Sequence, residues 1–484
     1  MTFWTTYWPH ITLALSIVIG VGAAIHAAMT KEDVRAATGW VGVILLSPIL
    51  GAFIYMVIGI NRVRRAAIVR RRRRAGAAPG DRGPDAQAAD VVPASAPQFA
   101  SLQRVGDRIS PFVVTPGNEL GLLHGGDEAY PAMLAAIREA QSSIALQSYI
   151  FDNDPVGREI AEALIEARGR GVEVRVLIDA IGARYSRPPI IPLLRDGGVT
   201  TARFMSNIIG LKLPYANLRS HRKLLIVDGE TAFTGGMNIR AEFTSAHAEG
   251  KPARDTHARI RGPVLQALHA AFVQDWRFTT GERLSGRAWQ VPAPPPGSEA
   301  SPGVLARTIL SGPDHDLGSN HSLVMGAIAV AQESIRICSP YFLPDQILVG
   351  ALAVAARRGI AVDIVIPDAN NLTLVDYAMT AQLDQLLLPG CRIWRATGPF
   401  DHSKLMAVDG AWALIGSSNL DPRSLRLNFE LDVEIYDRGI AGEIDAGIRR
   451  RIASAKAETL ATLRARPLLK RIRNRAVWLA SPYL

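Results

Sequence analysis

The strongest constraint on this chain is a pattern of residues that occurs twice at the same spacing. Each copy begins with a histidine, has a lysine two positions later, then four apolar residues, an Asp-Gly pair and a glycine-containing segment that ends in asparagine; the copies are 221–238 and 402–419. With 10 histidines and seven lysines in the chain, composition alone predicts about 0.15 His-x-Lys triplets. Two triplets in equivalent places therefore indicate a duplicated site.

The segments before each copy repeat in the same order. Periodicity predicts helix, strand, helix and strand at 130–141, 143–151, 156–168 and 172–178, and again at 322–332, 334–342, 346–358 and 361–366. Alternating helices and strands are typical of an α/β fold, in which helices cover a sheet. We therefore expect two tandem α/β lobes, each a β-sheet sandwiched by helices.

The spacing within each copy predicts which side chains lie together. Side chains at positions i and i+2 of a strand share a face, so His221 and Lys223 should point the same way. The same holds for His402 and Lys404. An Asp-Gly pair is a tight-turn signal that leads to the next strand.

The aspartate of each copy, Asp228 or Asp409, is an odd number of residues from its histidine and lysine. Regular alternation along a strand would point it away from them. We interpret both aspartates as turn or scaffold residues, with a direct catalytic role as the alternative.

The doubled H-x-K-x4-D-x6-G pattern resembles the signature of the phospholipase D superfamily, and the similarity covers residues 117–440. Within that superfamily the chain is most similar to bacterial cardiolipin synthases. Further segments that resemble theirs are 148–151, 311–314, 340–345 and 419–424, with Asn428 and Glu430 after the last. Gln147 departs from the family pattern, which has a glutamate at this position.

The resemblance implies two lobes that face each other across a pseudo-twofold axis, with both His-Lys-Asn sets in one pocket. It implies that one histidine attacks phosphorus to give a phosphohistidine. The other histidine would protonate the leaving group and later deprotonate the incoming hydroxyl. Because the first motif more often supplies the nucleophile in this superfamily, His221 is assigned to attack and His402 to proton transfer.

The residues that the resemblance assigns to the site fall into three groups. They are the catalytic residues His221, Lys223, Asp228, His402, Lys404 and Asp409, the phosphate-binding Asn238 and Asn419, and the histidine-orienting Asp255 and Glu430. Which carboxylate orients which histidine is left open by the sequence.

No cofactor and no catalytic metal are expected. The sequence has no His-x3-His pair and no His/Cys cluster of the kind that binds zinc. The two cysteines, Cys338 and Cys391, are far apart and form no Cys-x-x-Cys motif, which fits a reducing compartment.

Two uncharged segments near the N-terminus are long enough to cross a bilayer. Residues 11–29 and 38–60 contain no Asp, Glu, Lys or Arg. At about 1.5 Å per helical residue, each segment can span a hydrocarbon core of about 30 Å. We expect a two-helix transmembrane hairpin, and a pair of buried core helices is the alternative. A signal peptide is excluded for the first segment, because residues 1–10 contain no basic residue.

The net charge of +10 is concentrated in two short flanks. Residues 62–74 contain eight arginines, and residues 464–475 contain five arginines and one lysine, with no acidic residue in either run. Removing this +8 and +6 from +10 leaves −4 for the rest of the chain. Such flanks favour contact with anionic lipid over a nucleic-acid groove. A solvated charged face is the alternative for each run.

These features give an expected organisation and location. The expected segments are the transmembrane hairpin with its basic exit (1–74), a flexible linker (75–97), the first lobe (98–290), a Pro-rich connection (291–302), the second lobe (303–463) and a basic C-terminal tail (464–484). The positive-inside rule keeps the arginines at 62–74 in the cytoplasm. The chain is therefore expected in the inner (plasma) membrane as a multi-pass protein with cytoplasmic catalytic lobes.

The leading functional interpretation is transfer of a phosphatidyl group between two phosphatidylglycerol molecules, with release of glycerol. Its expected partners are phosphatidylglycerol and membrane lipid, without nucleic acid, and the oligomeric state is open. Hydrolysis of phospholipids is an alternative that shares every catalytic residue. A nucleic-acid phosphodiesterase of the same fold is a second alternative, disfavoured by the −4 remainder and the apolar segments. A third is a lipid-binding protein without activity, disfavoured by two intact motifs.

The arginine distribution predicts the topology of the N-terminal segments. A cysteine introduced at Glu32 should react with an impermeant thiol reagent in intact cells, because the 30–37 loop is expected outside. A cysteine at Ala78 should react only after the membrane is permeabilised. The reverse labelling pattern would contradict the assigned orientation.

Overall fold

The computed structural model describes residues 2–31, 34–59, 91–92, 96–205, 218–249, 251–292, 303–313 and 318–481. They form two units, one within residues 2–59 and the other comprising the described residues from 91 onward. The basic run 62–74, most of the expected linker and most of the Pro-rich connection lie outside the described residues.

The smaller unit is helical. Its elements are α1 (Thr2–Thr30), α2 (Val34–Leu46), α3 (Pro48–Ile54) and a π-helical turn, η1 (Tyr55–Gly59). Within the described residues, one helical stretch is long and apolar enough to cross a membrane, Tyr7–Thr30. It contains the first expected span.

The second expected span, 38–60, is not one helix. It is divided between α2 and α3, because Ser47 has φ −147° and ψ 82° and the next residue is proline. Proline lacks an N–H and clashes with the preceding helical turn, so it begins a new helix here instead of continuing α2. The structure therefore contains one spanning-length helix and a broken apolar segment, which differs from the expectation of two continuous spans.

In the larger unit, both expected lobes share one mixed sheet among the described residues. The strands of the first half are β1 (Thr115–His124), β2 (Ser143–Ser148), β3 (Glu173–Asp179), β4 (Thr200–Phe204), β5 (Arg219–Ser220), β6 (Leu224–Val227), β7 (Thr231–Gly235) and β8 (Thr256–Arg261). Those of the second half are β9 (Val304–Ser311), β10 (Ser334–Cys338), β11 (Ala361–Pro367), β12 (Arg392–Ala396), β13 (Leu405–Val408), β14 (Trp412–Gly416), β15 (Asn428–Tyr436) and β16 (Lys456–Glu458).

The strand order reveals the duplication. It is β16-β12-β11-β10-β13-β14-β15-β9 in the second half, continuing into β1-β8-β7-β6-β2-β3-β4 of the first, with β5 beside β15. The halves join where β1 and β9 pair antiparallel, with Thr115 opposite Ala306. In both halves the β-hairpin that follows the His-x-Lys triplet, β6–β7 or β13–β14, lies beside a parallel pair of strands. The expected α/β duplication is thus seen as one continuous sheet.

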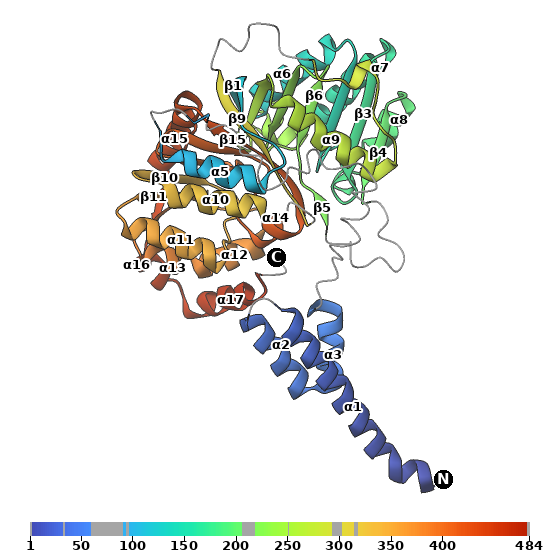
Figure 1. The fold of residues 1–484 in the computed structure, drawn as a ribbon, viewed down its shortest axis with the longest axis vertical. Helices are drawn as coiled ribbons and strands as arrows, with labels where there is room; N and C mark the ends of the chain where they lie inside the picture. The colour runs from blue at the N-terminus through green and yellow to red at the C-terminus, as the bar shows by residue number, and fades with distance from the viewer. Residues whose placement is uncertain are drawn as a thin grey trace. The chain divides into compact units, whose positions relative to one another are not determined.

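Helices cover both faces of each half (Figure 1). In the first half they are α6 (Gly126–Glu139), α7 (Pro155–Gly169) and α8 (Ile191–Asp196) on one face and α9 (Leu265–Thr280) on the other. In the second half they are α10 (Ser319–Val330), α11 (Gln346–Arg357), α12 (Thr373–Gln382) and α13 (Asp384–Leu387) opposite α15 (Arg438–Ala453). Strand alternation produces this arrangement: Leu146 packs among α6–α8, whereas the next residue, Gln147, bonds to α9. The remaining helices are α5 (Phe99–Ile109), α14 (Pro422–Arg426), α16 (Leu460–Arg464) and α17 (Leu468–Leu479).

Helix α5 packs in the second half although it precedes the first half in the sequence. Phe99 and Leu102 are fully buried in the hydrophobic core of the second half. Its partner there is α10. The expected first lobe, 98–290, therefore begins with a helix that stabilises the second half.

The Asp-Gly pairs form the turns of the β6–β7 and β13–β14 hairpins. Asp228 and Gly229 have φ values of 54° and 69°, and the second turn has 52° and 58°. Two consecutive positive φ values are the requirement of a type I′ turn, which favours Asp-Gly. The turn interpretation is therefore confirmed.

Each turn aspartate also binds the start of a neighbouring strand. The carboxylate of Asp228 accepts backbone N–H bonds from Gln141, Ser142 and Ser143 at 2.9, 2.7 and 2.9 Å. Asp409 does the same for residues 332–334 at 2.8–2.9 Å. Burial raises the pKa of Asp228, but these donors outweigh it and hold the pKa below its usual value. Both aspartates thus fix the loop before β2 or β10 to the hairpin.

Replacing a turn aspartate should lower stability. Asp228→Ala leaves three N–H groups without their acceptor and places alanine at positive φ, so it should cost about 2 kcal/mol of unfolding free energy. Glu230→Ala, at the exposed end of the same turn, is the matched control. Thermal unfolding followed by circular dichroism measures both. Equal melting temperatures for the two variants would contradict the scaffold role.

Candidate active site

The two His-Lys pairs lie in extended segments just before β6 and β13, not inside the strands as expected. All four side chains are in buried residues, none more than 8% exposed. Lys223 Nζ donates to the carbonyl oxygen of His221 at 2.6 Å, and Lys404 Nζ to that of His402 at 2.5 Å. Each lysine is therefore held against its own histidine.

The two histidines are oriented by carboxylates of the opposite half. His221 Nδ1 lies 2.9 Å from Glu430 Oε2 on β15, and 3.1 Å from the carbonyl oxygen of Ser417. His402 Nδ1 lies 3.0 Å from Asp255 Oδ2, just before β8. An Nδ1–H that donates to a carboxylate fixes the tautomer and leaves the lone pair on Nε2. The pairing that the sequence left open is thus crossed, and neither half completes its own histidine.

The two carboxylates have different surroundings. Glu430 accepts bonds from Ser417 Oγ at 2.6 Å and Asn428 Nδ2 at 3.1 Å. Asp255 instead accepts the backbone N–H of Thr256 at 2.7 Å. A Cβ on Gly236, the counterpart of Ser417, would lie 2.6 Å from an Asp255 oxygen. The Asp255 carboxylate therefore lies where a side chain at position 236 would be. This explains why the first motif has glycine at the position where the second has Ser417.

Burial without an anion disfavours positive charge throughout the site. Burial lowers the pKa of His221 far below its usual value, and Lys223 and Lys404 lower it further. Burial and then Lys404 lower the pKa of His402 to about 3. Burial also lowers the pKa of Lys223 to about 7 and that of Lys404 to about 8. Both imidazoles are therefore neutral at pH 7, and an anion between the lysines would relieve the electrostatic cost.

The two motif asparagines are buried, at 6% and 3% exposure. The side-chain oxygen of Asn238 accepts the backbone N–H of Ile150 at 3.2 Å, which presents its amide nitrogen as a donor. Asn419 Nδ2 lies 3.4 Å from Ser424 Oγ. The structure brings the histidines, the lysines, Asp255 and Glu430 together. Asn419 is linked to them through Ser424, which bonds to Glu430, and Asn238 through Ile150, next to Tyr149. Asp228 and Asp409 lie apart, beyond the far ends of β6 and β13.

Aromatic side chains beside the histidines were not assigned from the sequence. The Tyr149 ring lies 5.3 Å from the His221 ring, and the Tyr341 ring lies 6.2 Å from that of His402. Phe243 and Phe400 also contact His402, with ring centroids at 6.3 and 5.9 Å. Both tyrosines belong to segments that resemble the family, 148–151 and 340–345, which was the available signal.

An ion pair behind each histidine ties the site to a helix. In the first half, Arg222 lies 2.7 Å from Asp275 on α9, and both side chains are fully buried. In the second half the charges are reversed, with Asp401 2.5 Å from Arg451 on α15. Gln147 donates to Asp275 at 2.9 Å. A glutamate at this position would add a second buried acid beside one arginine, so glutamine fits the pair that is present.

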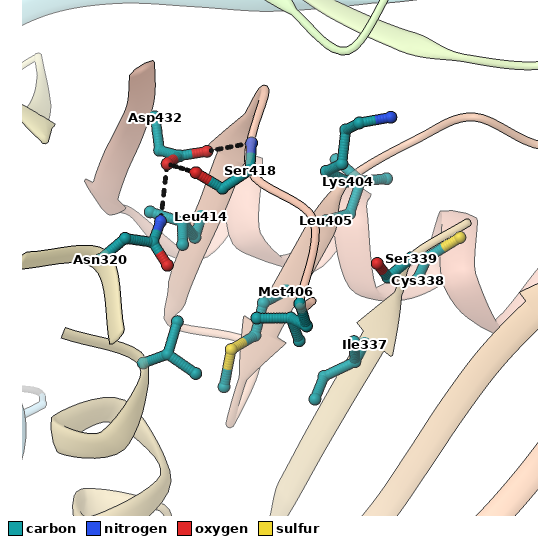
Figure 2. A pocket seen from close by; sticks show the side chains of 12 residues that line it. Asn320, Ile337, Cys338, Ser339, Lys404, Leu405, Met406, Leu414, Ser418 and Asp432 are labelled. Atoms are coloured by element: carbon teal, nitrogen blue, oxygen red, sulfur yellow. Dashed lines mark hydrogen bonds between the residues drawn. The ribbon is translucent and has the colours of Figure 1, made fainter. Parts of the chain in front are cut away.

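A small cavity lies next to Lys404 in the second half (Figure 2). On one side of it, Asp432 accepts bonds from Asn320 at 2.6 Å and from Ser418 at 2.5 Å. Burial raises the pKa of Asp432 to about 7. Among the described residues, no group of three or more His, Cys, Asp or Glu side chains is arranged to hold a metal ion.

Comparisons with known proteins agree on the family. A family model described as "Cardiolipin synthase, PLD-like domain" matches residues 133–276 and 324–452. Cardiolipin synthase A of Pseudomonas aeruginosa PAO1 is 32% identical over 96% of this chain and 94% of its own length. Cardiolipin synthase A of Pseudomonas putida GB-1 is 29% identical over the full length of both. The crystal structure of phosphatidylserine synthase from Haemophilus influenzae has a TM-score of 0.62 at 17% identity, covering 79% of this chain and 99% of that one, and shows a shared fold.

The depressed imidazole pKa predicts unusual reactivity at acidic pH. Diethyl pyrocarbonate modifies neutral imidazole, so an imidazole of ordinary pKa, about 6.5, loses most of its reactivity between pH 7 and pH 5. His402, with a pKa of about 3, should react at nearly the same rate at both pH values. Peptide mass spectrometry measures this rate, with N-acetylhistidine as the control in the same solution. A fall at His402 as large as that of N-acetylhistidine would contradict the prediction.

Proposed function

The chain belongs to the phospholipase D-like cardiolipin synthase family, and we propose that it transfers a phosphatidyl group from one phosphatidylglycerol to another and releases glycerol. Cardiolipin synthase activity follows from near-full-length relatives at about 30% identity. It implies phosphatidylglycerol as substrate. The roles proposed for the individual residues rest on one observation. The two buried histidines pair with Glu430 and Asp255 of the opposite halves.

In the first proposed step, the Nε2 lone pair of His221 attacks the phosphorus of the donor. The bond from phosphorus to the headgroup glycerol oxygen breaks, and that oxygen takes the proton of the His402 imidazolium. The products are phosphatidyl-His221 and glycerol. Lys223, Lys404, Asn238 and Asn419 would stabilise the charge that develops on the non-bridging phosphate oxygens.

Donor binding and protonation of His402 are coupled in this proposal. Burial and the positive Lys404 hold the pKa of His402 at about 3. An anionic phosphodiester between the lysines offsets that charge, while Asp255 stabilises the imidazolium through Nδ1. The acid is therefore formed when the donor enters.

In the second proposed step, a glycerol hydroxyl of a second phosphatidylglycerol attacks the phosphohistidine. His402 takes the hydroxyl proton, the phosphorus–nitrogen bond to His221 breaks, and cardiolipin leaves. Water as acceptor in this step would give phosphatidic acid. The step is therefore where transfer and hydrolysis separate.

We also propose that the N-terminal segments anchor the enzyme as a multi-pass inner-membrane protein with cytoplasmic lobes. The contacts of α1 with α2 and α3 support a helical hairpin, with Ala27, Ile44 and Tyr55 buried between them. Large apolar side chains elsewhere on the same helices, such as Val18 and Phe53, are exposed and would face lipid. The proposed segments remain 1–74, 75–97, 98–290, 291–302, 303–463 and 464–484, with membrane lipid and not nucleic acid as partner.

The direct test is incubation of the purified full-length protein with radiolabelled phosphatidylglycerol, followed by separation of the lipids. Labelled cardiolipin with stoichiometric glycerol is expected. Phosphatidic acid as the main product would instead identify a hydrolase. No lipid product, with cleavage of a nucleic-acid phosphodiester, would overturn the assignment.

The two histidines should fail in different ways. His221→Ala should lose both turnover and covalent intermediate, because no phosphorus–nitrogen bond can form. His402→Ala should accumulate phosphatidyl-enzyme from a donor whose leaving group needs no proton, because the second step lacks its base. Both variants should fall at least about a thousandfold in turnover. The measurement is acid-labile phosphatidyl label retained after a quench.

His124→Ala serves as a control, because the His124 side chain is exposed and pairs with Glu443 instead of with a residue of the proposed mechanism. Either variant leaves a buried carboxylate without its imidazole partner, which can lower stability. The melting temperature of each variant is therefore measured to exclude misfolding. Label on His221→Ala and none on His402→Ala would reverse the assignment. Label on both would mean that either histidine can attack.

A further inference from the structure

Helix α17 is fixed to the second half through one side. Asn474 is buried, and Val477 and Trp478 are partly buried. The Arg473 guanidinium lies 3.4 Å from the ring centroid of Tyr377 on α12. Arg475 pairs with Asp384 on α13 at 2.6 Å. The buried Asn474 and the partly buried Val477 and Trp478 therefore define the inner side of the helix, and the opposite side is its outer side.

The outer side of α17 is apolar and exposed. Leu468, Ile472 and Leu479 are 66%, 55% and 75% exposed, and Leu469 is 81% exposed. At about 100° per residue, the first three fall within an arc of about 40°. Four large apolar side chains in water on one short helix mark an interaction site.

Helices next to α17 also carry exposed leucines. Leu372 and Leu374, at the start of α12, are 48% and 55% exposed. Leu388, after α13, is 64% exposed. Since α17 packs on α12 (Figure 1), these leucines lie on the helices that support α17. We call α17 with Leu372, Leu374 and Leu388 the docking face.

The docking face is linked to the rim of the active site. Asn371, next to Leu372, accepts a hydrogen bond from Tyr341 Oη at 2.8 Å. The Tyr341 ring in turn lies 6.2 Å from the His402 ring. Both segments follow the carboxyl ends of β11 and β10, the edge of the sheet at which His402 lies.

The charge on the docking face selects its partner. On α17, Lys470 and Arg471 are exposed, whereas Arg473 and Arg475 are engaged by Tyr377 and Asp384. Residues 459–484 contain no acidic residue. Two copies related by a twofold axis would bring these like charges together. A nucleic acid would leave the leucines in water. An anionic phospholipid surface accepts both, because Lys470 and Arg471 can pair with headgroups while the leucines enter the acyl boundary.

We infer that the docking face binds the surface of an anionic bilayer and holds the active-site rim of the second half against it. The inference rests on the proposed function in that the substrate is itself an anionic bilayer lipid. Because the chain also has an apolar helix of spanning length, a modest interfacial affinity suffices: tethering makes docking intramolecular. The docking face would thus raise the rate at which lipid headgroups enter the site.

The first test places a fluorophore on α17 in the full-length protein. Both native cysteines are buried, so an Ala476→Cys thiol on the exposed side of α17 can be labelled selectively. In nanodiscs of phosphatidylcholine with phosphatidylglycerol, quenching by acrylamide should fall about threefold relative to detergent. Ala135→Cys on the exposed side of α6 is the matched control and should not change.

Three outcomes of the labelling would overturn the inference. One is equal quenching at both sites in every lipid. Another is equal protection in phosphatidylcholine with and without phosphatidylglycerol, which would remove the role of anionic lipid. The third is protection in detergent that grows with protein concentration, which would identify a second copy as the partner.

The second test measures activity. Ile472→Ser combined with Leu479→Ser should lower cardiolipin formation in nanodiscs by about fivefold and leave turnover of dispersed short-chain phosphatidylglycerol unchanged. Val354→Ser, at an exposed apolar residue of α11, is the control. An equal loss with both substrates would indicate a structural effect and overturn the inference. The two proposals can also fail separately. If the otherwise unchanged protein forms no cardiolipin but the label at Ala476→Cys is still protected by anionic lipid, the proposed function fails and the docking face stands.

Discussion

The crossed hydrogen bonds between histidines and carboxylates are the constraint on which the larger unit depends. His221 needs Glu430 from β15, and His402 needs Asp255 from beside β8. Both carboxylates belong to the central part of the sheet, where β15, β9, β1 and β8 are neighbours. A shift between the halves would separate both pairs at once, so the continuous sheet serves the site directly. The duplication is retained as one composite centre, because neither half orients its own imidazole.

The same centre is electrostatically incomplete without its substrate. Two lysines and two imidazoles are buried together, and burial lowers the pKa of all four. The lysines are only partly charged near neutral pH, since burial lowers their pKa values to about 7 and 8. A phosphodiester anion restores those charges, and the restored charges bind it more tightly. The selectivity for an anionic phosphodiester and the protonation of the general acid therefore have the same cause, the burial of four basic groups in one site. The proposed mechanism uses no metal ion.

Local signals in the sequence predicted most of the fold. Periodicity located the helices and strands of both halves, and Asp-Gly predicted the type I′ turns and the scaffold position of Asp228. Three features depended on tertiary contacts instead. Phe99 joins the core of the second half, the carboxylates cross between halves, and Gly236 accommodates Asp255 where Ser417 supports Glu430. The second apolar span was mispredicted for a local reason. The prediction used the length of the uncharged run and gave too little weight to Pro48, which begins a new helix after Ser47.

A transferase of this kind must favour a lipid hydroxyl over water, although water is far more abundant. The histidines are only 8% exposed, and aromatic rings flank both, Tyr149 on one side and Tyr341, Phe243 and Phe400 on the other. A phosphohistidine formed there would be shielded from bulk water, so its lifetime would depend on delivery of the second lipid. Delivery is faster when the rim of the site rests on the bilayer. The buried site and the proposed docking face therefore act on the same partition between cardiolipin and phosphatidic acid: one slows access of water and the other speeds access of lipid. Loss of the docking face should then shift the product ratio toward phosphatidic acid as well as lower the rate.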